Sequence, residues 1–362
     1  MLVNKCFISR RRRLCNLLQE KGLEVLIITQ PANLYYLTGF TGEAGALVAM
    51  RAEAALIIDG RFTVQAREEA RGVSIRLQKS TLPEAVGRFL RAARVKRVGY
   101  DPAALSVAQF RELRRAAGGG RVWRELSGLV EGLRAQKDPS EIAQIRNAAR
   151  LASNVLIDIL KLLKPGVREF EIAAEIEYQM RRRGASGPAF QTIVAFGERS
   201  ALPHARPTGR KLGKKELVVL DLGAILGHYC SDITRTVFVG RAPERIRHWY
   251  RAVREAQAAA VAAARAGVEC GEVDGAARRV LAGYRLDRYF VHSTGHGLGL
   301  EVHEEPRVAQ GQKQRLKPGS TITIEPGVYV PGTGGIRIED DVAVLPEGSE
   351  VLTRVPRDFI EL

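Results

Sequence analysis

Apolar and polar positions alternate in short blocks over the first third of the chain. Four apolar runs have the length and the polar boundaries of buried strands. They cover residues 24–29, 45–49, 54–58 and 73–77. Helical spacing of apolar side chains marks residues 9–21, 61–71, 83–94, 106–117 and 125–134. Because strands here alternate with helices, the pattern predicts a layered α/β domain over residues 1–132.

A helix start marks the beginning of a second domain. Asp138 can cap the first turn, Pro139 suits the first helical position, and Glu141 stands three residues after Asp138, as in a capping box. We therefore predict a long helix from this point and a second domain over residues 133–362.

The second domain repeats one plan. Helices predicted at 139–163 and 168–183 precede a strand-rich stretch at 190–240, and helices at 243–266 and 271–283 precede another at 289–345. Gly166 and Gly267 are 101 residues apart, and the runs 217–223 and 321–327 are 104 apart. The near-constant offset predicts two related α+β halves that face each other, with a site between them.

Four acidic residues stand in or beside apolar strand patterns of the two halves. An unpaired buried carboxylate costs several kcal/mol, so Asp221 inside 217–222 needs compensation. A turn at Leu226-Gly227 would set Asp232 directly opposite Asp221, within about 5 Å. Glu325 and Glu339 repeat the arrangement around the turn at 331–335. Like charges so placed require a cation, which indicates a metal site.

The second half also offers a nitrogen ligand. His296 lies between Gly295 and Gly297, which allow a close approach of backbone and substrate. Four carboxylates and one imidazole can hold two divalent ions, and this set suits Mn²⁺, Co²⁺ or Fe²⁺ at least as well as Zn²⁺. The chemistry expected of such a pair is hydrolysis by a water that bridges both ions and loses its proton near neutral pH.

These motifs resemble the pita-bread metallopeptidases, the family of prolidase (Xaa-Pro dipeptidase) and aminopeptidase P. The catalytic-domain motifs are VLDLGA, SDITRT, HSTGHGLGL, TIEPGVY and GIRIEDD. Weaker similarity to the family's creatinase-like N-terminal domain lies in NLYYLTGFTG and DGRF. The resemblance implies an α/β N-terminal domain followed by an α+β pita-bread domain with internal pseudo-twofold duplication.

The resemblance also implies roles for particular residues. Its metal ligands match Asp221, Asp232, His296, Glu325 and Glu339. Glu325 further matches the proton shuttle, and His204 and His303 match histidines that orient the scissile carbonyl and stabilise the tetrahedral intermediate. His292 and Arg337 match residues on the proline pocket and the substrate's C-terminal side, although an arginine beside acids can also serve only to balance charge. Short proline-containing peptides and a homodimeric partner are implied as well.

Several alternatives stay open at this level. Dipeptidase and aminopeptidase P activities depend on how loops and the partner subunit close the cleft, which sequence does not reveal. Another exopeptidase specificity of the same fold is one alternative, and a metal-free pita-bread module that binds protein or nucleic acid is another. All five ligand positions are occupied by ligand residues, which argues against the metal-free module.

Charge and composition bear on the cellular location of the protein and on its binding partners. The chain has 362 residues and a formal net charge of +16. Residues 1–137 hold 24 Lys and Arg against 12 Asp and Glu, so most of the excess lies in the first domain. No nucleic-acid-binding motif accompanies it, and we expect solvated arginines rather than a nucleic-acid partner. Four scattered cysteines and the absence of a signal-like or membrane-spanning apolar stretch predict a cytoplasmic protein.

Overall fold

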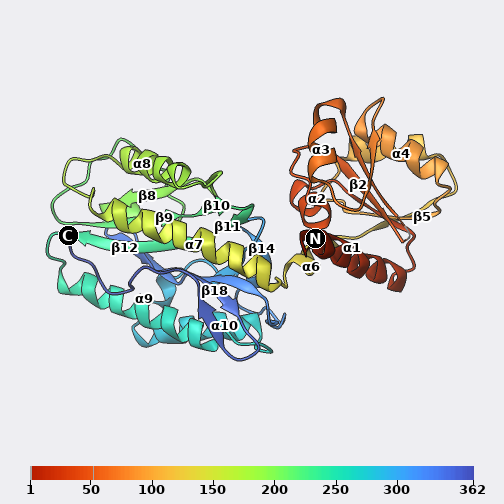
Figure 1. Cartoon of the computed structure of the whole chain (residues 1–362). Coiled ribbons are helices and arrows are strands. Elements are labelled where there is room, and N and C mark those ends of the chain that lie inside the picture. The colour runs from red at the N-terminus through yellow and green to blue at the C-terminus, as the bar shows by residue number, and fades with distance from the viewer. Residues whose placement is uncertain (1, 52) are drawn as a thin grey trace. The chain divides into compact units, whose positions relative to one another are not determined.

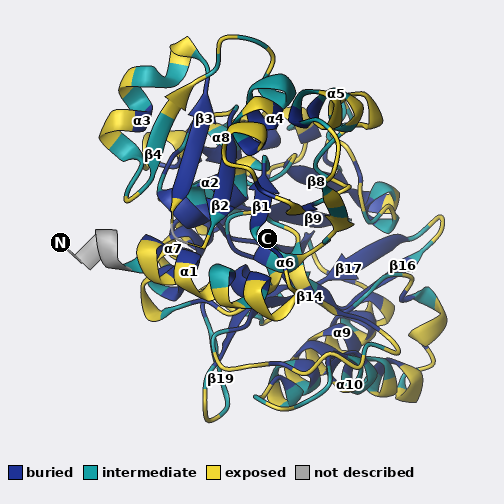
Figure 2. Cartoon of the chain, turned by 90° about the vertical axis from the view of Figure 1, so that its right-hand side faces the viewer, coloured by how far each residue is buried: buried dark blue, intermediate teal, exposed yellow. Residues whose placement is uncertain are grey.

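The computed structural model describes residues 2–51 and 53–362, with side chains from Cys6 onward, and divides the chain into two compact units. The first unit is Met1–Arg134 and the second is Ala135–Leu362 (Figure 1). In Figure 2 the central strands of both units are buried, whereas the helices have mixed burial with exposed outer faces.

The first unit is a six-stranded mixed sheet with helices packed on it. The strand order is β4-β3-β2-β1-β5-β6. The strands are β1 (Val25–Ile28), β2 (Ala46–Met50), β3 (Ala54–Ile58), β4 (Ser74–Leu77), β5 (Arg97–Tyr100) and β6 (Val122–Glu125). The helices are α1 (Leu2–Glu20), α2 (Pro31–Thr38), α3 (Thr63–Glu69), α4 (Leu82–Ala92), α5 (Val107–Ala117) and α6 (Leu129–Arg134). The predicted α/β character of this domain is confirmed.

Strands β5 and β6 and helix α2 of this unit were not predicted from the sequence pattern. β5 and β6 are short, and β6 lies at the sheet edge with largely exposed side chains, so neither forms an apolar run. The helix predicted at 125–134 begins later, as α6 at Leu129, because Glu125 is paired with β5 and Gly128, directly before the helix, has a positive φ of 72°.

The second unit contains two pairs of helices, each packed on its own sheet. The helices are α7 (Pro139–Leu160), α8 (Glu169–Arg182), α9 (Glu244–Ala263) and α10 (Cys270–Gly283). The predicted capping box at the start of α7 is present: the Asp138 carboxylate accepts from the Ser140 and Glu141 amides, and the Asp138 amide donates to Glu141. One apolar core joins α7 and α8 to the first sheet, and a second joins α9 and α10 to the other.

Each half has a sheet of antiparallel strands. β8 (Ile193–Phe196), β9 (Glu216–Leu222) and β12 (Ile233–Val239) form one sheet, and β13 (Gly295–Gly297), β14 (Glu304–Val308), β15 (Thr321–Ile324), β18 (Asp340–Val344) and β19 (Ser349–Val351) form the other. The Gly166 amide donates to Leu212, and the Gly267 amide donates to Leu316, both at 2.8 Å. The same contact at corresponding places supports the internal duplication, and the predicted fold class is confirmed.

The register of the first acidic hairpin differs from the prediction. In β10 (Ala224–Leu226) and β11 (Tyr229–Cys230), Leu226 pairs with Tyr229, so the turn is Gly227-His228 and not Leu226-Gly227. Both turn residues have positive φ, 56° and 73°, as a tight two-residue hairpin requires. Asp221 consequently faces Thr234, and Asp232 lies diagonally across from it.

The second acidic hairpin has the expected pairing. Ile324 pairs with Asp340, and Gly327 of β16 (Gly327–Val330) pairs with Arg337 of β17 (Gly334–Arg337). The two ladders keep one register, which places Glu325 opposite Glu339 between them. The Glu339 amide donates to the Thr234 carbonyl at 3.1 Å, so a ligand position of the second half is hydrogen-bonded to the first.

The residues on either side of His296, Gly295 and Gly297, have no room for a side chain. A Cβ atom at Gly295 would lie 1.9 Å from the Thr323 carbonyl oxygen, because β13 is pressed between β14 and β15. The glycines around His296 are therefore required by backbone packing.

We predict that Gly295→Ala lowers the free energy of unfolding by about 1–3 kcal/mol, the usual cost of overpacking. Gly283→Ala is the matched control, since Gly283 ends α10 with no atom within 4 Å of its added Cβ, and it should be neutral or slightly stabilising. Urea unfolding followed by circular dichroism measures both, and equal values for the two variants would contradict the packing argument.

Candidate metal centre

Three of the five predicted ligands meet at one point of the second unit. One ligand atom each from Asp232, His296 and Glu339 lies within 4.8 Å of the others. Asp232 stands just before β12, His296 lies in β13, and Glu339 lies between β17 and β18. The group therefore joins the first half to the second, as the duplication predicted.

The fourth predicted ligand borders this group. Glu325 Oε1 is 3.4 Å from His296 Nε2, and Asp232 Oδ2 is 3.8 Å from the same nitrogen. His296 Nδ1 is 3.0 Å from the Gly297 carbonyl oxygen, an acceptor only, so Nδ1 carries the proton. Nε2 thus presents its lone pair to the carboxylates. Burial lowers the pKa of His296 to about 4, which keeps the imidazole neutral, as a metal ligand must be.

The fifth predicted ligand is held by an arginine. Asp221 Oδ2 accepts from Arg337 Nη2 at 2.6 Å, and both side chains are nearly inaccessible. Arg337 Nε donates to Thr234 Oγ1 at 3.0 Å, and that hydroxyl donates to Glu339 at 2.6 Å. Arg337 therefore contacts one predicted ligand directly and reaches a second through Thr234.

The electrostatics of this cluster call for a cation. Burial first, and then repulsion among the acids, raises the pKa of Asp232 and Glu339 well above their ordinary values, and burial raises that of Glu325 to about 8. Among the described residues, Asp221 Oδ1 and Asp232 Oδ1 are buried with no hydrogen-bond partner. Oxygen-rich donors with orphaned buried lone pairs fit divalent metal ions.

His292 belongs to a hydrogen-bonded chain that ends at Asp221. Its Nδ1 is 2.8 Å from the Ser293 carbonyl oxygen, and its Nε2 is 2.8 Å from the Tyr329 hydroxyl. Since Arg337 Nη1 donates to that hydroxyl at 2.7 Å, the tyrosine proton points to His292. Burial, followed by the Arg337 charge, lowers the pKa of His292 to about 4.

The two remaining predicted histidines are exposed beside the cluster. The rings of His303 and His296 meet edge to face, with centroids 4.4 Å apart. Partial burial and the nearby His204 lower the pKa of His303. His204 also contributes to the lowered pKa of His292. Exposed imidazoles next to a set of buried ligands are placed to meet a substrate from solvent.

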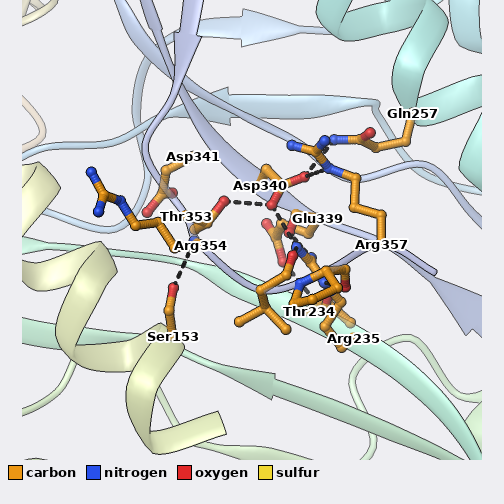
Figure 3. Close-up of polar contacts among 12 residues, drawn as sticks. Ser153, Thr234, Arg235, Gln257, Glu339, Asp340, Asp341, Thr353, Arg354 and Arg357 are labelled. Carbon is orange, nitrogen blue, oxygen red and sulfur yellow. Dashed lines mark hydrogen bonds and ion pairs between the residues drawn. The ribbon is translucent and has the colours of Figure 1, made fainter. Parts of the chain in front are cut away.

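A second polar network, which the sequence did not indicate, contacts the backbone of Glu339 (Figure 3). Asp340 pairs with Arg235 at 2.8 Å inside the protein and also accepts from Gln257, Thr353 and Arg357. Arg235 Nη1 donates to the Glu339 carbonyl at 2.6 Å. Main-chain and side-chain contacts together fix the position of Glu339.

Sequence reasoning missed Thr234, Tyr329 and the Asp340 network. Strand parity could have found two of them: Thr234 is two residues after Asp232, and Tyr329 is four after Glu325, so each shares a face with a predicted ligand. Nothing local distinguishes Asp340, because its partners come from α9, β12 and the segment after β19.

The fold and this site define a metallopeptidase, and comparison with known proteins agrees. Residues 143–346 match metallopeptidase family M24, and residues 10–136 match the creatinase/prolidase N-terminal domain. The chain belongs to metallopeptidase family M24, and the predicted resemblance is confirmed. The family implies divalent metal ions, in keeping with the donor set of the site.

Both kinds of proline-specific peptidase occur among similar proteins. A solved structure of a Xaa-Pro dipeptidase from Bacillus anthracis is 36% identical, covers 98% of this chain and 100% of its own, and superposes with a TM-score of 0.95. An X-Pro aminopeptidase from Thermotoga maritima is 34% identical over 94% of this chain and 98% of its own, with a TM-score of 0.88. A Xaa-Pro dipeptidase of Pyrococcus furiosus is 35% identical over 97% of this chain and 99% of its own.

We predict that the metal-free protein loses stability as pH rises from about 6.5 to about 8. A carboxyl whose folded pKa is raised binds more protons folded than unfolded, so stability falls up to the folded pKa, about 8 for Glu325. The lowered pKa values of His292 and His296 make stability rise with pH, but only below about pH 6.5, the ordinary pKa of histidine.

Thermal melts in a chelator across this pH range test the expectation. Glu325→Gln should flatten the dependence, because it removes a titrating group, and added Mn²⁺ should flatten it in the unsubstituted protein. A chelated protein whose melting temperature rises steadily to pH 8 would contradict the assignment.

Proposed function

We propose that this chain is a dinuclear-metal peptidase that cleaves the Xaa-Pro bond in dipeptides or at peptide N-termini. The observation that carries the proposal is the convergence of four carboxylates, three of them buried, and one neutral imidazole from both halves, with Arg337 paired to one of the acids, Asp221. The relatives named as Xaa-Pro dipeptidases and an X-Pro aminopeptidase support the choice of substrate.

The residues that would hold the two ions are Asp221, Asp232, His296, Glu325 and Glu339. Mn²⁺ or Co²⁺ suits this set best, with Zn²⁺ or Fe²⁺ as alternatives. When bound, the ions supply Lewis acidity and an activated water for peptide hydrolysis. Glu325 contributes proton transfer in this proposal, since it lies at the edge of the cluster and is less buried than Glu339.

Around the ions, the histidines would act on the substrate. His204 and His303, both exposed beside the cluster, would orient the scissile carbonyl and donate hydrogen bonds to the developing oxyanion. His292 would line the proline pocket. The Arg337 side chain is only 4% exposed and is bonded to Asp221 and Tyr329, so we propose that it orients Asp221 in addition to bordering the substrate's C-terminal side.

A metal-free binding module is the second candidate, and the cluster disfavours it. A protein that never binds a cation would keep Asp221 Oδ1 and Asp232 Oδ1 buried without compensation. Homodimer formation and a cytoplasmic location stay predictions from the sequence. In the part of the chain that the structure describes, no helix combines the length and hydrophobicity that crossing a membrane needs.

Peptide turnover tests the proposal and separates its two forms. We expect the Mn²⁺- or Co²⁺-loaded protein to hydrolyse Xaa-Pro dipeptides, Xaa-Pro-Xaa peptides or both. A comparison of kcat/KM for the two lengths on one sample decides between dipeptidase and aminopeptidase. A correctly folded, metal-loaded protein that hydrolyses none of these peptides would refute the proposal, and the absence of stoichiometric metal would favour the binding module.

His204→Ala should lower kcat by about 10²–10³-fold, the usual loss when one oxyanion-stabilising donor is removed, while metal content is retained. His248→Ala is the control, because His248 is exposed on α9 against Tyr284 and should leave kcat unchanged. Steady-state kinetics with metal analysis checks both variants. Equal kcat values for the two would remove His204 from the proposed machinery.

A further inference from the structure

Two buried carboxylates outside the metal cluster each hold a loop that carries a histidine. The side chains of Glu169, at the start of α8, and Asp274, in α10, are both inaccessible to solvent. Neither belongs to the predicted ligand set. A fully buried carboxylate is costly unless its hydrogen bonds are satisfied, so their partners indicate what they do.

Glu169 holds both ends of residues 196–208, the loop with His204. Its carboxylate accepts from the Phe196 amide at 3.0 Å, and from the Thr208 amide and hydroxyl at 2.9 and 2.6 Å. Arg199 Nε donates to both carboxylate oxygens at 3.1 Å, and its Nη2 donates to the Arg206 carbonyl at 2.7 Å. One carboxylate thus fixes the loop before and after the histidine.

Asp274 holds residues 290–294, the loop with His292, in the same chemical way. Its carboxylate accepts from the Thr294 amide and hydroxyl at 3.0 and 2.8 Å. Arg278 Nε donates to Asp274 at 2.7 Å, and its Nη2 donates to the His292 carbonyl at 2.6 Å. A carboxylate, an arginine and a threonine again hold the backbone next to an imidazole.

The two clamps, Glu169–Arg199 and Asp274–Arg278, did not arise by simple copying of the repeat. At the offset of 101 residues, Glu169 corresponds to Cys270, and Asp274 corresponds to Ala173. The first clamp holds a loop after β8, whereas the second holds a loop before β13. The two loops are therefore held by the same kind of contact without being repeats of one another.

We propose that Glu169 and Asp274 are positioning residues that fix His204 and His292, respectively, for the substrate. The inference rests on the proposed function for those histidines. Because His204 would act on the carbonyl in the transition state, loss of the first clamp should reduce kcat with little change in KM. His292 would bind the proline side of the substrate, so loss of the second clamp should mainly raise KM.

The experiment compares Glu169→Gln and Asp274→Asn with Glu350→Gln. Glu350, in β19, forms a bidentate pair with Arg146 of α7 that is more exposed than either clamp. We expect kcat to fall about tenfold or more in Glu169→Gln and KM to rise by a similar factor in Asp274→Asn, at unchanged metal content. Glu350→Gln should change neither. Thr208→Val and Thr294→Val remove one donor from each clamp and serve if the carboxylate variants do not fold.

Double variants separate positioning from general destabilisation. In the His204→Ala protein, Glu169→Gln should not lower kcat further, because the loop no longer carries the imidazole that it would position. The ¹³Cε1–¹H signals of the histidine rings give a readout that needs no activity: the His204 signal should shift or broaden in Glu169→Gln while that of His248 does not.

Two results would overturn the inference. One is a full-size effect of Glu169→Gln in the His204→Ala protein, and the other is an unaltered His204 signal in Glu169→Gln. A wild-type protein that cleaves no Xaa-Pro peptide would instead refute the proposed function, and the ring signals would still report whether the clamps order the histidines.

Discussion

Four carboxylates gathered in a buried place with one arginine among them set the main constraint on this molecule. Asp221, Asp232, Glu325 and Glu339 repel one another, and burial removes the water that would screen them. Such an arrangement persists only where rigid neighbours enforce it. The two sheets, each packed against its own helix pair, supply that rigidity, and the acids lie where strands of the two halves meet.

Support for the cluster comes from successive polar contacts. Arg337 contacts Asp221, Thr234 passes the contact to Glu339, and Arg235 with Asp340 fixes the Glu339 backbone from behind. These contacts are hydrogen-bonded to one another, so Asp221 and Glu339 cannot move without breaking bonds in a buried network. Low dielectric surroundings make such bonds strong when they are satisfied.

The sequence predicted the parts of this design that leave a local pattern. The apolar strand patterns around the acids and the repeated offset pointed to them, and the register of the second hairpin was as expected. The first register was wrong by two residues along the opposite strand, because a glycine beside a histidine does not reveal which pair takes positive φ. A register shift of two residues leaves each side chain on the same face of the sheet, so the error does not change which residues face the candidate site. Contacts such as Arg235 with Asp340 join distant segments and leave no such pattern.

Arg337 also bears on whether this fold needs its metal to form. In small metal-dependent domains the ions hold together a chain with little core, and removal of the ions unfolds them. Here two large apolar cores surround the site, and Arg337 already neutralises part of the charge by pairing with Asp221 at 2.6 Å. Packing and this ion pair therefore offset part of the cost of gathering the acids. The oxygen-rich donors that the scaffold brings together fit divalent ions.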